Sequence, residues 1–328
     1  MHRLQSVSAG HVVGVDIGGT KLLAGAVGPG LEVAHQTRRD VWNVSLAALV
    51  DAIASAVEEI AAAVGPVEAV GLGVPCTIDR RTGIAVQAVH LPITDVHLAA
   101  VVGERVGVPV VVDNDANCAV LAEARFGVAR GLSEIVLLTL GTGIGGGLVL
   151  GGELYRGAVG AGAEMGHMVI DMDGPPCQGN CPNRGCLEAL ASGTALVREA
   201  ALRVARRPDT PLGLALEEGE LLTGVLVTEL AFRGDPVARD AIETVGRRLG
   251  VGLSSLVNIF NPEMIVIGGG VIAAGELLLA PARAELAARA LAPGRDLVRV
   301  EAAAFGPEAG MIGAALMARE EAVAPSHP

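Results

Sequence analysis

Short apolar runs recur along the chain, and each ends at glycine, proline or an acidic residue. Runs of about four to eight apolar residues between such turn-forming residues are typical of buried β-strands. The pattern predicts strands at residues 12–16, 67–74, 108–112, 135–140 and 264–267. Two of them pass through a glycine and threonine turn into a second apolar run, so we expect two β-hairpins whose second strands cover residues 22–27 and 147–150.

Helical spacing of apolar residues marks the segments between these strands. Residues 46–64 predict an amphipathic helix, and further helices are expected at residues 116–126, 236–257 and 309–319. Asp235 and Pro236 suit the N-cap and the first turn of the third helix. Strands and helices interleave throughout, which predicts an α/β fold. A length of 328 residues exceeds one ordinary core, so we expect two domains.

Charge and composition exclude several classes of protein. The net charge of −12 argues against nucleic acid or an anionic membrane surface as the main partner, because both require a basic face. Residues 135–152 are uncharged and long enough to span a bilayer, but their many glycines disfavour a helix and favour strand, turn and strand. No apolar signal segment opens the chain, so we expect a cytoplasmic protein.

A cluster of metal-binding side chains lies between residues 164 and 188. It contains three of the five cysteines and a histidine, which are the ligands of a closed tetrahedral zinc site: His167, Cys177, Cys181 and Cys186. Redox thiols and disulfides are the alternatives, although a reducing compartment disfavours disulfides. Cys76 and Cys118 stand alone in apolar surroundings and are expected to be core residues. A structural metal would hold Glu164, His167 and Glu188 around one point, as a ligand rich in hydroxyls requires.

The two glycine hairpins suggest a duplicated fold that grips a phosphate chain from two sides. Glycine lets backbone N–H groups approach phosphate oxygens, and threonine adds a hydroxyl donor. Neither turn has the spacing of a P-loop. A third glycine run, GGG at residues 268–270, is a candidate contact for the nucleotide's base and ribose.

Two carboxylates are candidates for chemistry at the strand ends. Asp115 follows a predicted buried strand, where ligands of α/β sheets collect, and could accept a hydroxyl proton. The alternative is that Asp113, Asn114 and Asp115 only cap the next helix. Asp16 is similarly placed and is expected to position magnesium or its waters.

These motifs together resemble the ROK family of sugar kinases and repressors, within the actin-like ATPase superfamily. The matching segments span nearly the whole chain: DIGGTK (16–21), GVP (73–75), DNDAN (113–117), LGTGIGGG (140–147), EMGH (164–167), GCLEALASG (185–193) and NPEMIVIGGG (261–270). The resemblance implies two actin-like, ribonuclease H-like α/β domains with a central cleft. We place the smaller domain at residues 1–113 and the larger at 114–304, with a C-terminal helix at about 305–321 packing back on the first.

The resemblance also implies roles for single residues. Asp115 would be the general base, and Asn114, Asp115, Glu164, His167 and Glu188 would bind the sugar. His167, Cys177, Cys181 and Cys186 would hold zinc, so His167 would serve twice. ATP with Mg²⁺ would be bound by Asp16, Gly18, Gly19, Thr20, Lys21, Gly141, Thr142, Gly143, Gly269 and Gly270.

Two positions depart from the family pattern. Cys177 and Cys181 are separated by three residues where the family usually has one, so a longer loop must bring Cys177 to the metal. Cys76 replaces the glycine that usually follows GVP. If that glycine approaches the sugar, the thiol alters sugar selectivity.

We therefore expect an ATP-dependent kinase that phosphorylates the 6-hydroxyl of glucose and forms a homodimer or homotetramer. The main alternative is a kinase of another hexose, such as fructose, mannose or N-acetylmannosamine. A sugar-responsive repressor of the same family is less favoured, because only about eleven residues precede the first strand and leave no room for a DNA-binding module. Polyphosphate as phosphoryl donor is disfavoured by the scarcity of basic residues.

Overall fold

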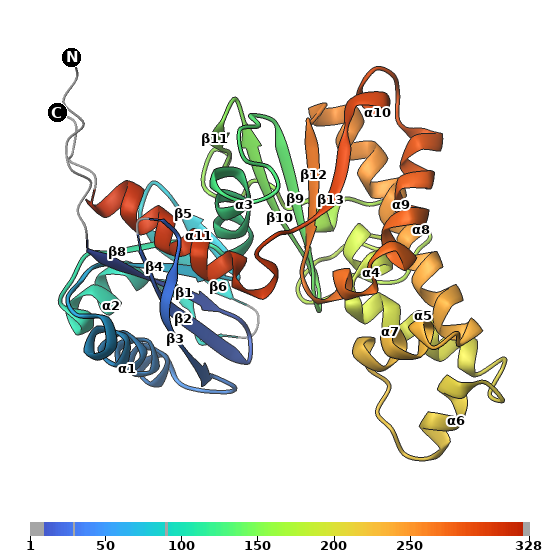
Figure 1. Cartoon of the computed structure of the whole chain (residues 1–328), viewed down its shortest axis with the longest axis horizontal. Coiled ribbons are helices and arrows are strands. Elements are labelled where there is room, and N and C mark those ends of the chain that lie inside the picture. Colours follow the sequence, from blue (N-terminus) through green and yellow to red (C-terminus); the bar gives the residue numbers. More distant parts are fainter. Residues whose placement is uncertain (1–9, 29, 89–90, 324–328) are drawn as a thin grey trace.

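The computed structural model describes residues 10–28, 30–88 and 91–323, and it shows two α/β halves side by side (Figure 1). Residues 1–9, on which the expected location partly rests, lie outside the described part. The first half is built on a sheet in which β2 and β3 run antiparallel to their neighbours while β4 and β8 lie parallel to β1. Its spatial order is β3 (Val33–Asp40), β2 (Lys21–Val27), β1 (His11–Ile17), β4 (Val67–Val74) and β8 (Val110–Asn114).

The second half repeats this sheet strand for strand. A hairpin again begins it, and two further strands again lie parallel to the first strand of that hairpin. The order is β11 (Glu153–Leu154), β10 (Ile144–Leu150), β9 (Ile135–Leu140), β12 (Met264–Gly268) and β13 (Arg299–Ala302). The predicted α/β class and the duplicated, two-domain actin-like architecture are therefore confirmed.

Helices cover both faces of the first sheet. On one face lie α1 (Leu46–Val64), whose N-cap Ser45 accepts a hydrogen bond from Ala48 N at 3.2 Å, and α2 (Leu98–Val106). On the other face α11 (Ala309–Ala318) lies directly on β1 and β4 and also contacts α3 (Asp115–Arg125). Glycines make this approach possible, because a Cβ on Gly71 would lie 1.8 Å from the Ala314 carbonyl oxygen.

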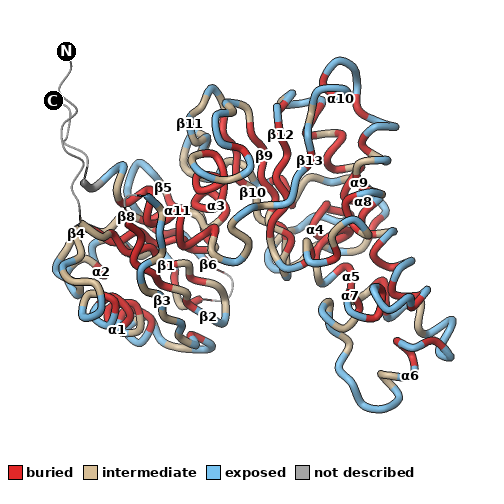
Figure 2. The backbone as a smooth tube through the Cα atoms, viewed as in Figure 1, coloured by how far each residue is buried: buried red, intermediate tan, exposed pale blue. Residues whose placement is uncertain are grey.

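The second sheet is also buried on both faces, which explains its continuous apolar strands. Along β9, Ile135 and Leu137 pack toward α3, whereas Val136 and Leu138 face the larger helical core. Figure 2 shows these central strands buried and the connecting loops exposed. That core includes α4 (Leu187–Ala191), α5 (Gly193–Val204), α6 (Pro211–Glu217), α7 (Gly224–Phe232), α8 (Pro236–Phe260) and α9 (Glu276–Arg289), and α10 (Gly294–Leu297) follows.

Most predicted elements are present, and two strands begin elsewhere than expected. The strand predicted at residues 108–112 runs instead from 110 to 114, because Pro109 has no N–H for the ladder and because Asp113 and Asn114 pair with Gly73 and Val74. The second strand of the second hairpin begins at Ile144 rather than Gly147, so its glycines lie within the strand.

Several elements were not predicted. Strand β3 is an edge strand with alternating exposure, and a small antiparallel sheet follows β4. Its strands are only three to five residues long and mix apolar with polar residues, so no long apolar run or alternation marks them: β5 (Cys76–Asp79), β6 (Ile84–Ala88) and β7 (Thr94–Val96). This sheet and the loop that packs on it turn out to form part of the site.

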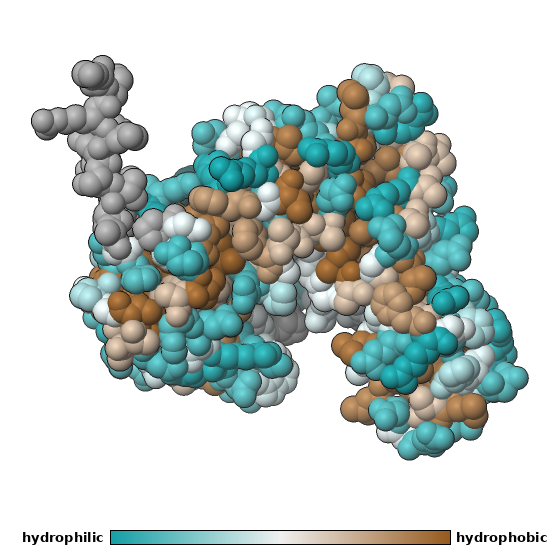
Figure 3. All heavy atoms as spheres, viewed as in Figure 1, coloured by the Kyte–Doolittle hydropathy of each residue, from teal (hydrophilic) through white to brown (hydrophobic). Residues whose placement is uncertain are grey.

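No helix in the described residues is long and apolar enough to cross a membrane. The space-filling view shows the molecular surface hollowed between the first half and the region of α6 and α7 (Figure 3).

Candidate active site

Two carboxylates flank the end of the central parallel strand of the first sheet. Asp16 is paired with Gly73 across β1 and β4, and Asp115 follows β8 on the other side of β4. A Cβ on Gly73 would lie 3.7 Å from Asp16 Oδ1 and 3.5 Å from the Cα of Asp115. Both acidic residues therefore lie close to one point beside Gly73. The predicted pair is thus brought together by the sheet.

The polar residues of the DNDAN segment (113–117) have different hydrogen-bond partners and different roles. Asn114 is the N-cap of α3 and accepts hydrogen bonds from Ala116 N at 2.9 Å and Asn117 N at 3.3 Å. Asp113 is buried, accepts from Asn117 Nδ2 at 2.9 Å and forms an ion pair with Arg156. Asp113 therefore has a structural role, as the capping interpretation predicted for part of this segment. Asp115 Oδ1 accepts only a short local bond from Ala116 N at 2.9 Å among the contacts of the described residues.

The acidic residues raise one another's pKa. Burial raises the pKa of Asp16 to about 7, and the nearby Asp115 carboxylate adds to the rise. Burial also raises the pKa of Asp115, against the hydrogen bond from Ala116, and the charge of Glu164 raises it further. Desolvated carboxylates with raised pKa values are suited to accepting a proton or holding a cation.

A cavity opens beside these carboxylates, and both halves of the molecule line it. Asn114 and Glu164 are among its walls, as predicted, together with Cys76, Thr77, Gly145, Gly146, Gly160, Gly162 and Ala163. Within the described residues Asp16, Asp115, His167 and Glu188 are not part of this lining, and Asp115 is the sequence neighbour of the wall residue Asn114. Thr77 and the wall at residues 160–163 were missed by sequence reasoning, and the dense glycines of GAVGAG (157–162) were the one signal for them.

Glu188 makes contacts within the protein. Its side chain is buried, and Oε2 accepts a hydrogen bond from Ile144 N at 2.8 Å. Cys177 Sγ lies 3.6 Å from Oε1. A Cβ on Gly143 would lie 2.3 Å from Oε2, so glycine is required there. Glu188 therefore connects the cysteine cluster to the second hairpin, and its contact with sugar stays a prediction.

The predicted phosphate-binding turns differ in their surroundings. In the first turn Gly18 N donates to the Lys21 carbonyl at 2.8 Å, and the Lys21 side chain is exposed. In the second turn Gly141 N donates to the Gly143 carbonyl at 2.9 Å, and a Cβ on Gly141 would meet no protein atom within 4 Å. Gly269 has a φ of 81°, and a Cβ there would lie 2.5 Å from the Leu140 carbonyl oxygen. The third glycine run therefore lies against the strand that leads into the second turn.

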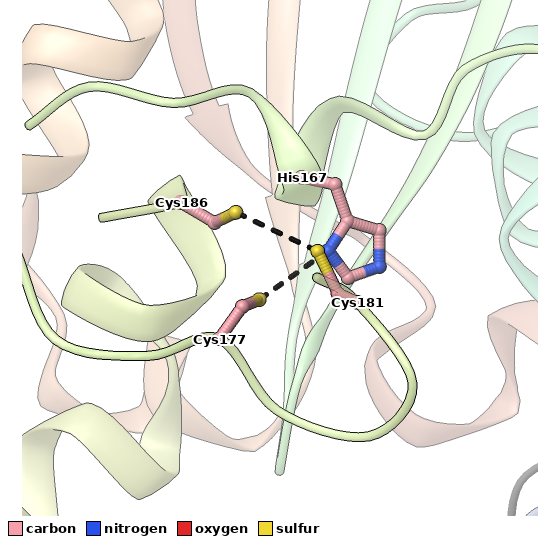
Figure 4. Close-up of side chains that lie close together, drawn as sticks. All are labelled: His167, Cys177, Cys181 and Cys186. Carbon is pink, nitrogen blue, oxygen red and sulfur yellow. Dashed lines mark hydrogen bonds between the residues drawn. The ribbon is translucent and has the colours of Figure 1, made fainter. Parts of the chain in front are cut away.

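The four predicted metal ligands converge on one point (Figure 4). One ligand atom from each of His167, Cys177, Cys181 and Cys186 lies within 4.8 Å of the others. Cys177 Sγ is 3.5 Å from His167 Nδ1, and the sulfurs of Cys181 and Cys186 are 3.9 Å apart. The longer loop thus brings Cys177 to the cluster. All five cysteines are free, and Cys76 and Cys118 are buried.

These spacings fit the donor set of a tetrahedral zinc ion. With Zn–S bonds of about 2.3 Å, two sulfur ligands are separated by roughly 3.8 Å, and a sulfur and a nitrogen by slightly less. The ligand atoms also come from elements fixed by the fold: His167 ends a single helical turn (Met165–His167), and Cys186 is the N-cap of α4. Burial and the neighbouring thiols raise the pKa of Cys177, so three thiolates here need a cation.

A duplicated α/β fold with glycine hairpins in both halves and carboxylates in the shared cleft defines a protein of the actin-like class. Within that class the chain belongs to the ROK family, whose family model matches residues 12–321. The resemblance read from the motifs is therefore confirmed.

Three relatives show how far the likeness extends. A glucokinase of Streptomyces coelicolor is 40% identical over 95% of this chain and 98% of its own. The crystal structure of a ROK family glucokinase from Streptomyces griseus in complex with glucose and AMPPNP has a TM-score of 0.85 at 38% identity, covering 95% of this chain and 100% of that one. A xylose repressor of Caldicellulosiruptor bescii is 32% identical over 82% of this chain and 68% of its own.

Proposed function

We propose that the protein is a glucokinase, which transfers the γ-phosphate of ATP to the 6-hydroxyl of glucose. The observation that carries this proposal is the cavity between the two halves. Polar groups suited to a sugar, from Asn114 and Glu164, share it with the glycine-rich strand of the second hairpin. Relatives named as glucokinases match nearly the whole chain. The acceptor sugar would thus lie in this cavity, beside Asp115 and next to the glycine turns of both hairpins.

Asp115 acts as the general base in this proposal. Its carboxylate takes the proton of the 6-hydroxyl as that oxygen attacks the γ-phosphorus, and the bond from this phosphorus to the β,γ-bridging oxygen breaks. The electron pair of the broken bond leaves with ADP. Because burial raises the pKa of Asp115, the carboxylate is a stronger base than an exposed one. The rest of catalysis is positioning and charge neutralisation.

Asp16 is the residue that would hold magnesium or its waters. When both are ionised, Asp16 and the neighbouring Asp115 form a local excess of negative charge that a divalent cation offsets. Magnesium bound to ATP supplies charge neutralisation on the phosphate oxygens. A Cβ on Gly310 would lie 2.7 Å from Asp16 Cγ, so glycine at the start of α11 keeps space beside this carboxylate.

Zinc would be held by His167 and the three cysteines, and its role is structural because four protein ligands complete its coordination. Through Nδ1, His167 faces the thiols, which leaves its other ring nitrogen on the far side of the ring for a sugar hydroxyl (Figure 4). Nucleotide phosphates would lie on residues 18–21 and 141–143, and the ribose and base near Gly269 and Gly270.

Boundaries and assembly complete the proposal. We place the smaller domain at residues 1–113 and the larger at 114–304, and expect a homodimer or homotetramer. The contacts of α11 with β1 and β4 support its assignment to the smaller domain. Light scattering on the purified protein measures the assembly, and a monomeric mass would contradict this part.

A panel of sugars in a coupled ADP-release assay tests the function and the acceptor together. We expect the highest kcat/KM for glucose, a lower value for 2-deoxyglucose, and a lower value still for fructose, since a site that pairs a hydroxyl rejects analogues lacking it. Cys76 lines the cavity, so N-acetylmannosamine should be excluded by the bulk of its acetyl group. A preference for N-acetylmannosamine would contradict glucose as the substrate and leave the kinase activity in place. If no sugar is phosphorylated, the proposed kinase activity is wrong.

A further inference from the structure

Protein donors hold the backbone of the second hairpin turn from one side. The Thr142 carbonyl oxygen accepts hydrogen bonds from Thr194 Oγ1 at 2.8 Å and from Gln178 Nε2 at 3.2 Å. The Gly141 carbonyl oxygen accepts from Gly193 N at 2.8 Å. Gln178 is the residue after Cys177 and also donates to Ser192 Oγ at 3.2 Å. The turn is therefore fixed both by the start of α5 and by the cysteine loop.

The direction of these bonds decides where the amide hydrogens of the turn point. In a trans peptide the carbonyl and the N–H of one plane point in opposite directions. Holding the Thr142 carbonyl toward Gln178 and Thr194 thus turns Gly143 N–H away from them. Because the Gly141 carbonyl points toward Gly193, the N–H of Thr142 likewise points away from Gly193. Two successive N–H groups on one side of a glycine turn form an anion-binding concavity.

We infer that Gln178 and Thr194 are positioning residues that orient the second hairpin turn for the nucleotide's phosphates. This inference rests on the proposed function and assigns the cysteine loop a further task, since it reaches the nucleotide side of the cleft as well as the sugar side. Gln178 directly follows Cys177, so the cysteine loop itself supplies the contact. Thr142 keeps its side chain exposed and is held by its carbonyl alone.

Isosteric variants separate this role from general stability. Gln178→Leu and Thr194→Val each remove one donor, and each should weaken binding of a non-hydrolysable ATP analogue about five-fold, the size of one neutral hydrogen bond. The double variant leaves the Thr142 carbonyl without both side-chain donors and should lose at least about ten-fold. Thr194→Ser keeps the hydroxyl and should stay within about two-fold of wild type.

Calorimetric titration with the analogue, and separately with glucose, gives the decisive comparison. Asn180→Leu, at an exposed position in the same loop, is the matched control and should bind the analogue as wild type does. Glucose affinity and bound zinc should be unchanged in the donor variants. Unchanged analogue affinity in the double variant, or equal losses for glucose and the analogue, overturns the inference while leaving the proposed function intact. A wild-type protein that does not bind the analogue overturns both.

Discussion

The two sheets share their strand order, yet the residues at equivalent positions differ in chemistry. In the first sheet Asp16 pairs with Gly73, and in the second Thr139 pairs with Gly268. The glycine is kept while the carboxylate is replaced by a hydroxyl. One strand further on, β8 continues into acidic residues, whereas β13 ends at Ala302 and continues with Ala303.

The shared backbone therefore fixes where the strand ends lie, and the side chains at those ends fix which ligands each half suits. The duplicated backbone brings both hairpins to the same edge of their sheets, because parallel neighbours end together there. At that edge of the first sheet lie the carboxylates of Asp16 and Asp115, which suit protons and cations. In the second half, hydrogen bonds to the carbonyls of the turn orient its backbone N–H groups, and such N–H groups suit anions. One fold thus supplies two complementary sites.

The largest expected effect concerns Asp115, the carboxylate without a counterpart in the second half. Asp115→Asn keeps size and hydrogen bonding but removes proton acceptance, so kcat should fall by roughly 10²-fold or more. Glucose affinity should largely survive. Steady-state kinetics with Asp79→Asn, a carboxylate on the small sheet paired with Arg81, provides the control. Turnover near the wild-type value would remove Asp115 from the role of base.

The buried Asp16 carboxyl should lower the free energy of unfolding at neutral pH. Thr139, at the equivalent position of the second sheet, has no ionisable group and should not. The pKa of Asp16, about 7 in the folded state, exceeds the ordinary value of 3.8, so the folded state keeps a proton that the unfolded state releases. The free energy of unfolding therefore falls as pH rises from about 4 to about 7. Asp16→Asn should be more stable than wild type at pH 8 by about 2–4 kcal/mol, and by less toward pH 4.

Urea denaturation without magnesium at several pH values measures this difference. Thr139→Val, at the equivalent position, should leave the pH dependence of wild type unchanged. A pH profile for Asp16→Asn that is parallel to wild type would contradict the assignment of the buried proton to Asp16.

Loss of the metal should weaken glucose binding, by less than the loss expected in kcat for Asp115→Asn. Purified protein should contain about one zinc per chain, and Cys181→Ser should lose the metal and raise the KM for glucose roughly ten-fold. Because Cys177 lies with the other ligands, Cys177→Ser should behave like Cys181→Ser. Metal analysis together with kinetics checks both variants. Full activity in zinc-free protein would refute the metal's positioning role.

Lys21 offers the smallest effect and distinguishes the two turns. It ends the first hairpin turn, where the second has Ile144. Lys21→Met should weaken ATP affinity about three-fold to five-fold, as expected for one exposed charge, and Lys21→Arg should largely preserve it. The KM for ATP is the measurement. Two silent substitutions would show that the two turns bind phosphate by backbone groups alone.

Local patterns were enough to predict much of this fold. Helix α1 was predicted with its observed bounds, because apolar residues at helical spacing and the following glycine mark it without help from the rest of the chain. The metal ligands were also predictable, since Cys and His at short spacing have few other uses in a reducing compartment. By contrast, strands β5 to β7 are only three to five residues long, too short for a periodic pattern to mark them, and sequence reasoning missed them.

The sequence by itself determined the α/β class, the duplicated hairpins, the family and the four candidate metal ligands, because each depends on residue type and short spacing. Only the tertiary structure decided which polar residues line the cavity and which form contacts within the protein instead. It paired Asp113 with Arg156, placed Cys76 in the cavity wall, and directed Glu188 and Gln178 to the second hairpin. These contacts join segments tens of residues apart, and hydrogen-bond partners at that separation are set by packing rather than by any local pattern.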